Sequence, residues 1–297
     1  MAAIRCLDEA HGESFAAYHG DCVDVLAQIP DASIGMSVFS PPFSNLFVYS
    51  ESEADIGNAS SDDEFLTHYR YVARELLRVT MPGAQAVVHC SDIPLMKWRD
   101  GVIGVNPLSD MLSSVHREAG WILHSRVTIW KCPVVEMTRT KALGLLHKQL
   151  LKDSSMSRVG MPDYLLVFRA PGARREPVGH RPADFPVEKW QKWASPVWMD
   201  IRQTNTLNAA QARDDADERH VCPLQLDLIE RAVIMWSNRG DTVLSPFMGI
   251  GSEGFVALKQ RRRFIGVELK ESYWRQACRH LAAAESGAAT LFDAAGS

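Results

Sequence analysis

The sequence predicts an α/β fold in which a largely parallel sheet carries helices on both faces. Short apolar runs that suit buried strands alternate along the chain with amphipathic helical patterns. Residues 241–268 predict a strand, a glycine-rich turn, a helix and a second strand, which together form half of a nucleotide-binding sheet. This half is too small to form a sheet alone, so its strands must lie beside strands from the first part of the chain.

The composition fits one large domain, or a core with an added lobe. The chain has 297 residues, of which 46% are hydrophobic, enough for a sizeable core. No stretch approaches the roughly 18 apolar residues of a membrane span, and the first residues lack the apolar core of a signal peptide. The six cysteines have no metal-binding spacing. We therefore expect reduced thiols, no metal, no membrane and a cytoplasmic protein.

The first predicted elements are a strand, a helix and a second strand within residues 13–43. The second strand ends at Ser40-Pro41-Pro42-Phe43. Two prolines stop a strand and leave a stiff turn without N–H donors, so the turn offers the Ser40 hydroxyl and nearby carbonyls as acceptors. Acceptors beside the flat ring of Phe43 suit a flat molecule with an amino group, such as adenine or cytosine. An isolated tetrapeptide of this kind is more often an ordinary loop.

The middle of the chain is less regular. Residues 44–63 predict a polar loop, and residues 62–130 alternate helical and strand patterns. A basic helical insert follows at 131–160. Residues 171–219 are rich in proline, tryptophan and charge and show little periodicity.

The clearest pattern of the C-terminal part lies at 241–268. Gly249 and Gly251 would let the backbone turn tightly and approach a ligand closely. The strand that follows ends at Glu268, a carboxylate that can hold a pair of ribose hydroxyls. With Gly254, which we expect to pack the helix closely, the glycines also match the dinucleotide fingerprint of nicotinamide oxidoreductases. Only 43 residues of the 297 follow Gly254 and no second nucleotide half is evident, so that alternative is disfavoured.

The two motifs together resemble the S-adenosylmethionine-dependent DNA amino-methyltransferases, which modify adenine N6 or cytosine N4. The shared motifs are SPPF at 40–43, SPF-x-G-x-G at 245–251 and GVE at 266–268. Their order, with the catalytic motif first, is that of the beta class, and the chain resembles its solitary, prophage-type members. The likeness extends to further segments at 19–22, 75–89, 121–131, 162–168 and 220–225. It implies a Rossmann-like methyltransferase sheet that is circularly permuted and carries inserted target-recognition elements.

The resemblance also divides the chain. It implies a catalytic half at 13–133, target-recognition inserts at 134–160 and 170–219, a cofactor-binding half at 220–285 and a tail at 286–297. Within the catalytic half it implies a helix, a Pro82-Gly83 turn and a strand. We expect His89, in that strand, to have a structural role.

The resemblance assigns the chemistry to Ser40, Pro41, Pro42 and Phe43. The exocyclic amine of adenine or cytosine is a poor nucleophile because its lone pair is delocalised into the ring. The Ser40 hydroxyl and the Pro41 carbonyl would hold the amine hydrogens so that the lone pair faces the methyl group. Phe43 would stack on the base, which must first leave the duplex. Many relatives carry aspartate where Ser40 stands; serine is neutral and also a donor, so it should hold the amine less strongly.

The cofactor implied by the resemblance is S-adenosylmethionine. Asp21 would bind its adenine amine, with Cys22 nearby, although Asp21 could instead cap the following helix. Glu268 would bind the ribose hydroxyls. The family usually has aspartate where Ser245 stands, which leaves the contact to the methionine ammonium open. The predicted cofactor-binding residues are Asp21, Cys22, Ser40, Pro223, Gln225, Ser245, Phe247, Gly249, Gly251 and Glu268.

Basic residues gather where the beta class inserts its target-recognition elements. The net charge of −4 does not indicate a nucleic-acid binder, so DNA binding requires local segregation of charge. Residues 139–158 hold five basic residues against one acid, and residues 169–192 hold six against three. Such runs can be solvated faces, but we favour DNA contact. The predicted DNA-binding residues are Arg139, Lys141, Lys148, Lys152, Arg158, Lys189 and Lys192.

The predicted activity is site-specific methylation of double-stranded DNA, with adenine N6 as the preferred target. Cytosine N4 is the alternative, because the SPP form leans toward cytosine enzymes and both amines present the same hydrogens. A DNA-binding regulator without activity is a distant alternative, and a protein-glutamine methyltransferase would place its cofactor glycines before the catalytic motif. We expect a bacterial or phage-encoded homodimer that reads a palindromic site and associates with the nucleoid.

Overall fold

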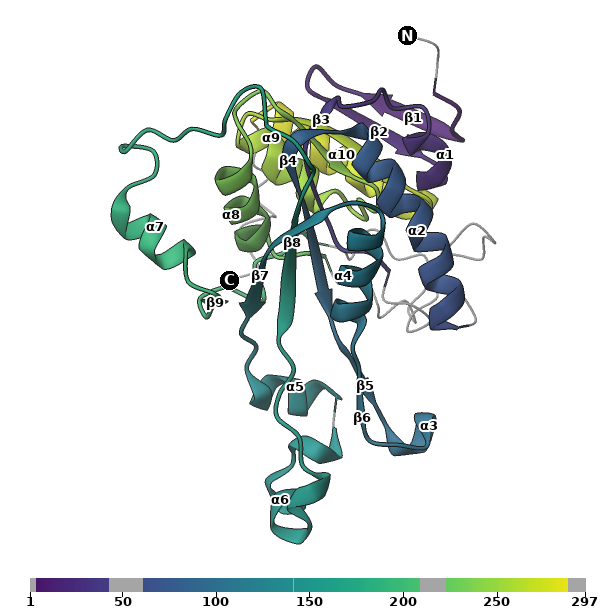
Figure 1. The fold of residues 1–297 in the computed structure, drawn as a ribbon, viewed down its shortest axis with the longest axis vertical. Coiled ribbons are helices and arrows are strands. Elements are labelled where there is room, and N and C mark those ends of the chain that lie inside the picture. The colour runs from purple at the N-terminus through teal and green to yellow at the C-terminus, as the bar shows by residue number, and fades with distance from the viewer. Residues whose placement is uncertain (1–3, 43–60, 141, 209–222, 288–297) are drawn as a thin grey trace.

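The computed structural model describes residues 4–42, 61–140, 142–208 and 223–287. Nine strands of these residues form one sheet (Figure 1), in the order β1-β2-β11-β10-β3-β4-β8-β7-β9. Within this described sheet, five neighbouring strands are parallel. They are β2 (Phe15–His19), β11 (Arg263–Glu268), β10 (Thr242–Ser245), β3 (Ile34–Phe39) and β4 (Thr80–Ser91).

Antiparallel strands flank this parallel centre. On one side, β1 (Asp8–His11) pairs with β2. On the other side, β8 (Asp163–Arg169) runs antiparallel to β4, and β7 (Ile122–Ile129) runs antiparallel to β8. The direction of β7 is therefore that of β4 again. The short β9 (Val197–Trp198) pairs in parallel with β7.

The strands of the last half-unit lie in the middle of the sheet. β10 pairs with β3 through Val243 and Met36, and β11 pairs with β2 through Ile265 and Ala16. Two strands from the C-terminal part of the chain thus separate two strands from its N-terminal part. This arrangement confirms the predicted circular permutation of an α/β sheet.

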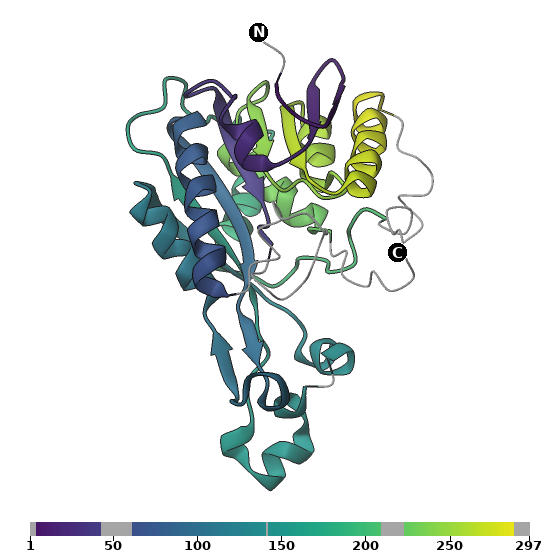
Figure 2. The same cartoon turned by 90° about the vertical axis from the view of Figure 1, so that its right-hand side faces the viewer.

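Helices cover both faces of the sheet (Figures 1 and 2). They are α1 (Cys22–Leu26), α2 (Asp62–Val79) and α4 (Leu108–Glu118) on one face, and α8 (Leu226–Trp236), α9 (Ser252–Lys259) and α10 (Glu271–Glu285) on the other. The strands supply both cores because their side chains alternate between the faces. In β4, Val87 belongs to the core under α8 and α9, whereas Ala86 and Val88 belong to the core under α1 and α2. No helix among the described residues is long and apolar enough to cross a membrane.

The predicted turn at Pro82-Gly83 is wrong, because both residues lie inside β4. The register between β3 and β4 shifts at this point. Gly83 has a φ of 74°, and its N–H donates to the carbonyl of Ala170 at 3.1 Å. The strand bulges without ending, because glycine tolerates the left-handed backbone and proline has no N–H to satisfy.

Two inserts leave the sheet at the edge where the parallel strands end. β4 leads into a hairpin of β5 (Ile93–Leu95), α3 (Lys97–Asp100) and β6 (Gly104–Asn106), which the sequence patterns did not predict. β7 leads into α5 (Pro133–Thr140), η3 (Leu143–Leu145), α6 (His147–Lys152) and η4 (Ser154–Met156). Because β4 and β7 run in the same direction, both inserts project together (Figures 1 and 2). We call residues 92–106, 130–140 and 142–162 the arm.

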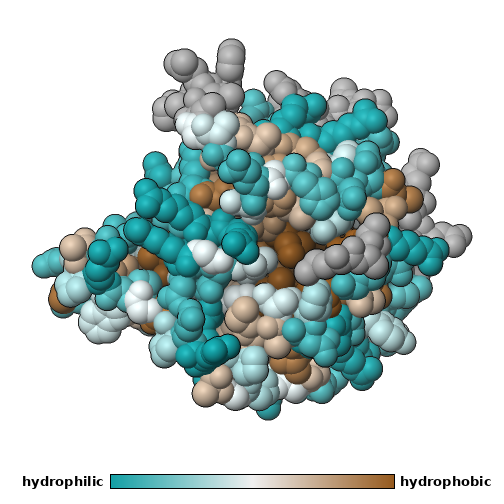
Figure 3. Space-filling model, turned by 90° about the horizontal axis from the view of Figure 1, so that it is seen from above, coloured by the Kyte–Doolittle hydropathy of each residue, from teal (hydrophilic) through white to brown (hydrophobic). Residues whose placement is uncertain are grey.

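A third segment, between β8 and α8, projects in another direction. It holds α7 (Val187–Trp193) and β9, and Figures 1 and 3 show it extending sideways from the sheet. Figure 3 views the end of the molecule opposite to the arm, where the surface is mostly hydrophilic around a central hydrophobic area. The arm therefore extends along the strands, whereas the α7 segment extends across them.

Candidate active site

The predicted catalytic and cofactor-binding residues meet at one edge of the sheet. Ser40 directly follows β3, Ser245 ends β10 and Glu268 ends β11, while Asp21 comes just after β2. These strands are parallel neighbours, so their carboxyl ends lie together. In α/β sheets this edge is where ligands bind. The structure thus gathers residues that are more than 200 positions apart in the 297-residue chain.

Ser40 contacts a histidine on the neighbouring strand. Its Oγ lies 3.2 Å from His89 Nδ1 and 3.2 Å from the carbonyl oxygen of His89, to which it is placed to donate. Pro41 is buried and Pro42 half-buried at the same turn, whereas Phe43 lies outside the described residues. His89, which the sequence predicts to be structural, therefore contacts the predicted catalytic serine directly.

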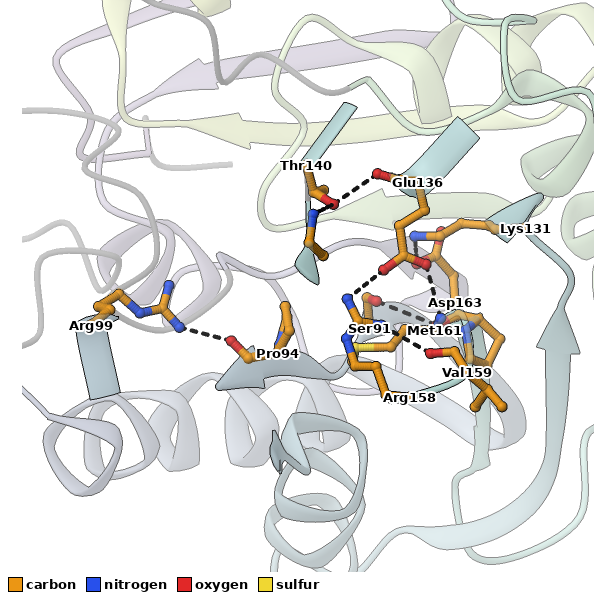
Figure 4. Close-up of polar contacts among 12 residues, drawn as sticks. Ser91, Pro94, Arg99, Lys131, Glu136, Thr140, Arg158, Val159, Met161 and Asp163 are labelled. Carbon is orange, nitrogen blue, oxygen red and sulfur yellow. Dashed lines mark hydrogen bonds and ion pairs between the residues drawn. The ribbon is translucent and has the colours of Figure 1, made fainter. Parts of the chain in front are cut away.

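The contact continues from His89 to a buried ion pair. His89 Nε2 lies 3.4 Å from Asp163 Oδ2, and Lys131 Nζ donates to Asp163 Oδ1 at 2.6 Å (Figure 4). Burial alone would raise the pKa of Asp163, but His89 and Lys131 outweigh it and hold this pKa well below its usual range. The carboxylate is therefore ionised. The sequence patterns gave no signal for this chain of contacts beyond placing His89 and Asp163 on two predicted strands.

The glycines of the turn after β10 serve two purposes. Gly249 and Gly251 have φ values of 52° and 87°, which glycine adopts without strain. A Cβ added at Gly249 would meet no atom of the described residues within 4 Å, whereas one at Gly254 would lie 2.3 Å from Leu281 and 2.5 Å from Phe264. Gly249 thus borders open space, and Gly254 allows close helix packing, as predicted.

Both predicted nucleoside-binding carboxylates are oriented by backbone N–H groups. Glu268 Oε2 accepts from Gly249 N at 2.8 Å and Oε1 from Lys270 N at 2.9 Å. Asp21 Oδ1 accepts from Val23 N at 2.8 Å, so Asp21 caps α1. Burial raises the pKa of Asp21, although the Val23 N–H opposes this shift. Capping fixes the carboxylate, and its predicted contact with a cofactor stays a prediction.

Several other predicted cofactor residues are packed into the protein. Cys22 is buried in the core under α1, and burial, followed by the charges of Asp21 and Glu268, raises the pKa of its thiol well above the usual value. Phe247 is half-buried with its ring centroid 5.9 Å from that of Phe39. Pro223 is half-buried shortly before α8. Their predicted contacts with a cofactor stay a prediction.

Two buried serine oxygens that bracket the glycine turn, and one amide oxygen on the residue before α8, have no hydrogen-bond partner among the described residues. They are Ser245 Oγ, Ser252 Oγ and Gln225 Oε1. Ser245 and Ser252 bracket the glycine turn, and Gln225 precedes α8, which packs against α9. A buried polar atom without a partner costs about 1–3 kcal/mol. The two serine oxygens could each make a hydrogen bond to a polar ligand group at this turn, and the predicted contacts with the cofactor stay a prediction.

Glu253, in the first turn of α9, is a buried carboxyl that the sequence patterns did not single out. It is 4% exposed, and burial, with a further contribution from the charge of Glu268, raises its pKa from 4.5 to about 8. At neutral pH the carboxyl therefore holds its proton and can donate a hydrogen bond. Among the described residues, no three histidine, cysteine, aspartate or glutamate side chains group as metal ligands.

Comparison with known protein families agrees with this geometry. The family model for DNA methylases of the N6/N4 type matches residues 34–279, which include Ser40, the glycine turn and Glu268. The chain belongs to the N6/N4 DNA methylase family. Its sheet is the fold of these methylases, with β3, which leads to Ser40, beside β10, which leads to the glycine turn.

Curated relatives of this chain are distant in sequence. The type II methyltransferase M.BamHI of Bacillus amyloliquefaciens is 26% identical over 262 residues, which are 85% of this chain but 54% of M.BamHI. M.MjaI of Methanocaldococcus jannaschii is 24% identical over 205 residues, which are 68% of this chain and 62% of M.MjaI. The chain thus spans little more than half the length of these two relatives. The DNA adenine methyltransferase YhdJ of Escherichia coli K12 is 24% identical over 91% of this chain and 83% of YhdJ.

Solved structures show the same fold as this N6/N4 methylase. TTHA0409 of Thermus thermophilus, solved in complex with S-adenosyl-L-methionine, has a TM-score of 0.67 at 25% identity, over 91% of this chain and 96% of TTHA0409. The cytosine-N4-specific PvuII DNA methyltransferase has a TM-score of 0.64 at 18% identity, over 90% of this chain and 86% of that enzyme. The second likeness shows the fold alone.

The predicted DNA-binding residues of this methylase fall into two groups. Lys148 and Lys152 are exposed on α6, in the arm. Arg158 instead pairs with the buried Glu136 at 2.9 Å, and the Glu136 carboxylate also accepts from Met161 N at 3.0 Å (Figure 4). Arg158 thus holds the arm together, and a phosphate contact would require breaking this pair.

Of the other residues predicted to bind DNA, two contact side chains of the protein, and the side chains of two lie outside the described part of the structure. Lys192 Nζ lies 2.6 Å from Asp200 Oδ2 while the side chain stays 61% exposed. Lys189 Nζ lies 4.5 Å from the centroid of the Trp193 ring. Lys141 and the side chain of Arg139 lie outside the described part of the structure. Lys148 and Lys152 are therefore the residues whose surroundings best suit a phosphate contact.

Proposed function

We propose that this protein is a site-specific DNA methyltransferase that moves the methyl group of S-adenosylmethionine to the exocyclic amine of a flipped base. The observation that carries the proposal is the adjacency of two strands. β3 ends at the acceptor-bearing turn of Ser40 and Pro41, and β10, paired directly with it, ends at the glycine turn. A methyl donor on one turn would face an amine on the other, which is the positioning that this reaction requires.

The side chains around the glycine turn support binding of S-adenosylmethionine. The cofactor would supply an electrophilic methyl group on a sulfonium. Ser245, Ser252 and Gln225, whose buried oxygens have no partner among the described residues, would hold the polar methionine end. Glu268, oriented by two backbone N–H groups, would hold the ribose hydroxyls. Asp21 would stand at the adenine amine.

The acceptors at the β3 turn support methylation of an amino group. The Ser40 Oγ and the Pro41 carbonyl would each accept a hydrogen bond from the exocyclic amine. The lone pair of the amine nitrogen would then be less delocalised into the ring and would face the methyl group. As the methyl arrives, positive charge grows on the nitrogen, and the two oxygens stabilise it. The nitrogen then becomes acidic and loses a proton, so no strong base is required.

We favour adenine N6 over cytosine N4 as the target. The resemblance to solitary adenine enzymes supports this choice, and YhdJ is itself named a DNA adenine methyltransferase. The SPP form of the catalytic motif supports the alternative, cytosine N4, which would use the same residues. The hydrogens of the two amines are alike, so the acceptors at Ser40 do not distinguish the bases.

The arm supports contact with double-stranded DNA. It leaves the sheet at the same edge as the site, because β4 and β7 end there (Figure 2). Lys148 and Lys152 on α6 would contact backbone phosphates beside the flipped base. We further propose a cytoplasmic, nucleoid-associated homodimer, since two copies would match the two halves of a palindromic site.

The proposal is tested by transfer of labelled methyl groups from S-adenosylmethionine to unmethylated genomic DNA, followed by mass spectrometry of the nucleosides. N6-methyladenine is the expected product, and N4-methylcytosine would replace the favoured target by the alternative. Absence of label in DNA, with cofactor binding intact, would overturn the proposed activity and point to a regulator that binds without modifying.

A further inference from the structure

A serine in the catalytic position raises a question of hydrogen-bond direction. A carboxylate at this position only accepts hydrogen bonds, but a hydroxyl has one hydrogen as well as two lone pairs. If the Ser40 hydrogen pointed at the amine of the base, it would oppose the amine hydrogens. Ser40 therefore serves the proposed reaction only if its own hydrogen is directed elsewhere.

The structure provides two acceptors for that hydrogen, both on His89. The carbonyl oxygen and Nδ1 of His89 each lie 3.2 Å from Ser40 Oγ. The carbonyl always accepts, but Nδ1 accepts only if the ring carries its hydrogen on Nε2. The direction of the Ser40 hydroxyl is thus coupled to the tautomer of the His89 ring.

The surroundings of Nε2 select that tautomer. His89 is 7% exposed, and its Nε2 is buried without a close hydrogen-bond partner among the described residues. The group that it faces is the Asp163 carboxylate, with Oδ2 at 3.4 Å, which is long for a hydrogen bond but within electrostatic contact. A ring nitrogen that faces a carboxylate carries the hydrogen.

Asp163 keeps its charge with the help of the Lys131 ammonium. Lys131 Nζ donates to Asp163 Oδ1 at 2.6 Å, on the oxygen that does not face His89. The two partners together hold the pKa of this buried carboxyl well below its usual range, although burial would raise it. The carboxylate is thus ionised and available to the His89 ring at neutral pH.

We propose that Lys131, Asp163 and His89 form a positioning chain that turns the Ser40 hydroxyl into a pure acceptor for the amine of the base. The inference rests on the proposed function. Lys131 donates to Asp163, His89 Nε2 points its hydrogen at the Asp163 carboxylate 3.4 Å away, and Ser40 donates to His89 Nδ1. The lone pairs of Ser40 Oγ then remain for the substrate. A neutral serine thus acts only as a hydrogen-bond acceptor, like the aspartate found in many relatives.

The first test is Asp163→Asn, which keeps the size of the side chain. An amide can donate to Nε2, which moves the ring hydrogen to Nδ1 and directs the Ser40 hydrogen toward the amine. We expect the single-turnover rate of methyl transfer to fall about 30- to 100-fold. Replacing the orienting aspartate by asparagine costs roughly 10,000-fold in enzymes whose histidine is itself the catalytic base. The loss expected here is smaller, because the His89 carbonyl can still accept the hydrogen of the Ser40 hydroxyl. The dissociation constants for S-adenosylmethionine and DNA should stay within about twofold of the unmodified protein's values, as expected for a group acting only on the reacting amine.

A matched pair at His89 keeps the proposal testable if Asp163→Asn is poorly folded. His89→Asn places an amide oxygen near the position of Nδ1, whereas His89→Leu has a similar size and no acceptor. Both leave the pair of Lys131 and Asp163 intact. We expect His89→Asn to retain at least about tenfold more activity than His89→Leu. The difference is the effect of one uncharged hydrogen-bond acceptor for the Ser40 hydroxyl. Equal losses in the two variants would overturn the proposal.

The decisive test repeats Asp163→Asn in a Ser40→Asp background. An aspartate at this position has no hydrogen to direct, so the second substitution should slow transfer less than about threefold there, as expected for uncoupled sites. A loss as large as in the Ser40 protein would mean that Asp163 acts through structure alone, and the positioning chain would be rejected. The proposed function itself is judged separately, by whether the unmodified protein methylates DNA at all.

Discussion

The two halves of the site are built differently. Most of the proposed cofactor half comes from one continuous stretch, in which β10, the glycine turn, α9 and β11 follow one another from Thr242 to Glu268, and only Asp21 and Gln225 are added from elsewhere. The proposed catalytic half is assembled from four separate segments, which contribute Ser40, His89, Lys131 and Asp163. The first half is therefore visible in a local motif, whereas the second exists only after the strands pair.

The largest expected effect is the loss of Ser40, which would affect only the catalytic half. Ser40→Ala should lower the single-turnover rate of methyl transfer by about 100- to 1,000-fold, because one preorganised acceptor for the developing charge is removed. The dissociation constant for S-adenosylmethionine, measured by titration calorimetry, should be unchanged. Ser33→Ala, at the residue just before the same strand, is the control. Unchanged turnover in Ser40→Ala would remove this serine from the mechanism.

Glu253 tests the cofactor half through pH. Its pKa in the folded protein is about 8, above the 4.5 of an ordinary glutamate. Between pH 4.5 and about pH 8, the folded protein therefore keeps a proton on this carboxyl that the unfolded chain has lost. The free energy of unfolding should therefore fall as pH rises through this window, by about 1 kcal/mol per pH unit, and level off above it. Urea unfolding at pH 5, 6, 7 and 8 measures the slope.

The matched variant for this prediction is Glu253→Gln, which cannot ionise. Its free energy of unfolding should depend less on pH than that of the unmodified protein over the same range. If both proteins show the same slope, the buried carboxyl does not hold its proton in the folded state, and the burial argument for the cofactor half fails.

Two glycine substitutions separate binding from packing within the cofactor half. Gly249→Ala places a left-handed alanine, at a cost of about 1 kcal/mol, with its methyl group in open space. We expect the dissociation constant for S-adenosylmethionine to rise about tenfold, since a methyl group would enter the space proposed for the cofactor. Gly254→Ala should instead lower the free energy of unfolding by about 1–3 kcal/mol through overlap with Leu281 and Phe264. The assignment fails if Gly249→Ala binds the cofactor normally.

The smallest expected effects lie in the arm, outside both halves. Lys148→Ala and Lys152→Ala should each weaken DNA binding a few-fold and reduce the slope of log affinity against log salt by about one. Arg158→Ala is the matched control, because its guanidinium pairs with the buried Glu136. That variant should lower the melting temperature and leave the salt slope unchanged. A salt slope that changes only in Arg158→Ala would reverse this assignment.

The same contrast explains how much the sequence could predict. The strand ends at Ser40 and Glu268, and the roles of Gly249 and Gly254, follow from residues close to one another in the chain. The contact of Ser40 with His89 depends on the pairing of β3 with β4 beyond the bulge at Gly83. No local pattern encodes that register.

Charge counts have a similar limit. Arg158 belongs to a basic run and was predicted to bind DNA, but its partner Glu136 lies 22 residues earlier, just outside that run. Counting charges in a window cannot show which of them are neutralised by the fold. The raised pKa of Glu253 was equally hidden, because burial rather than a neighbouring residue in the sequence causes it.

The central position of β10 and β11 has a consequence for synthesis of the chain. A ribosome makes β2 and β3 early and the two strands that join them last, so both early strands keep unpaired edges until most of the polypeptide has emerged. We expect cooperative folding of the sheet to wait for the C-terminal strands, and a chain stopped before Asp241 to be degraded rapidly by a protease. A protease-resistant fragment from such a chain would show that the first half folds by itself. We expect nascent copies of this protein to expose unpaired strand edges for longer than copies of an unpermuted sheet of the same size would.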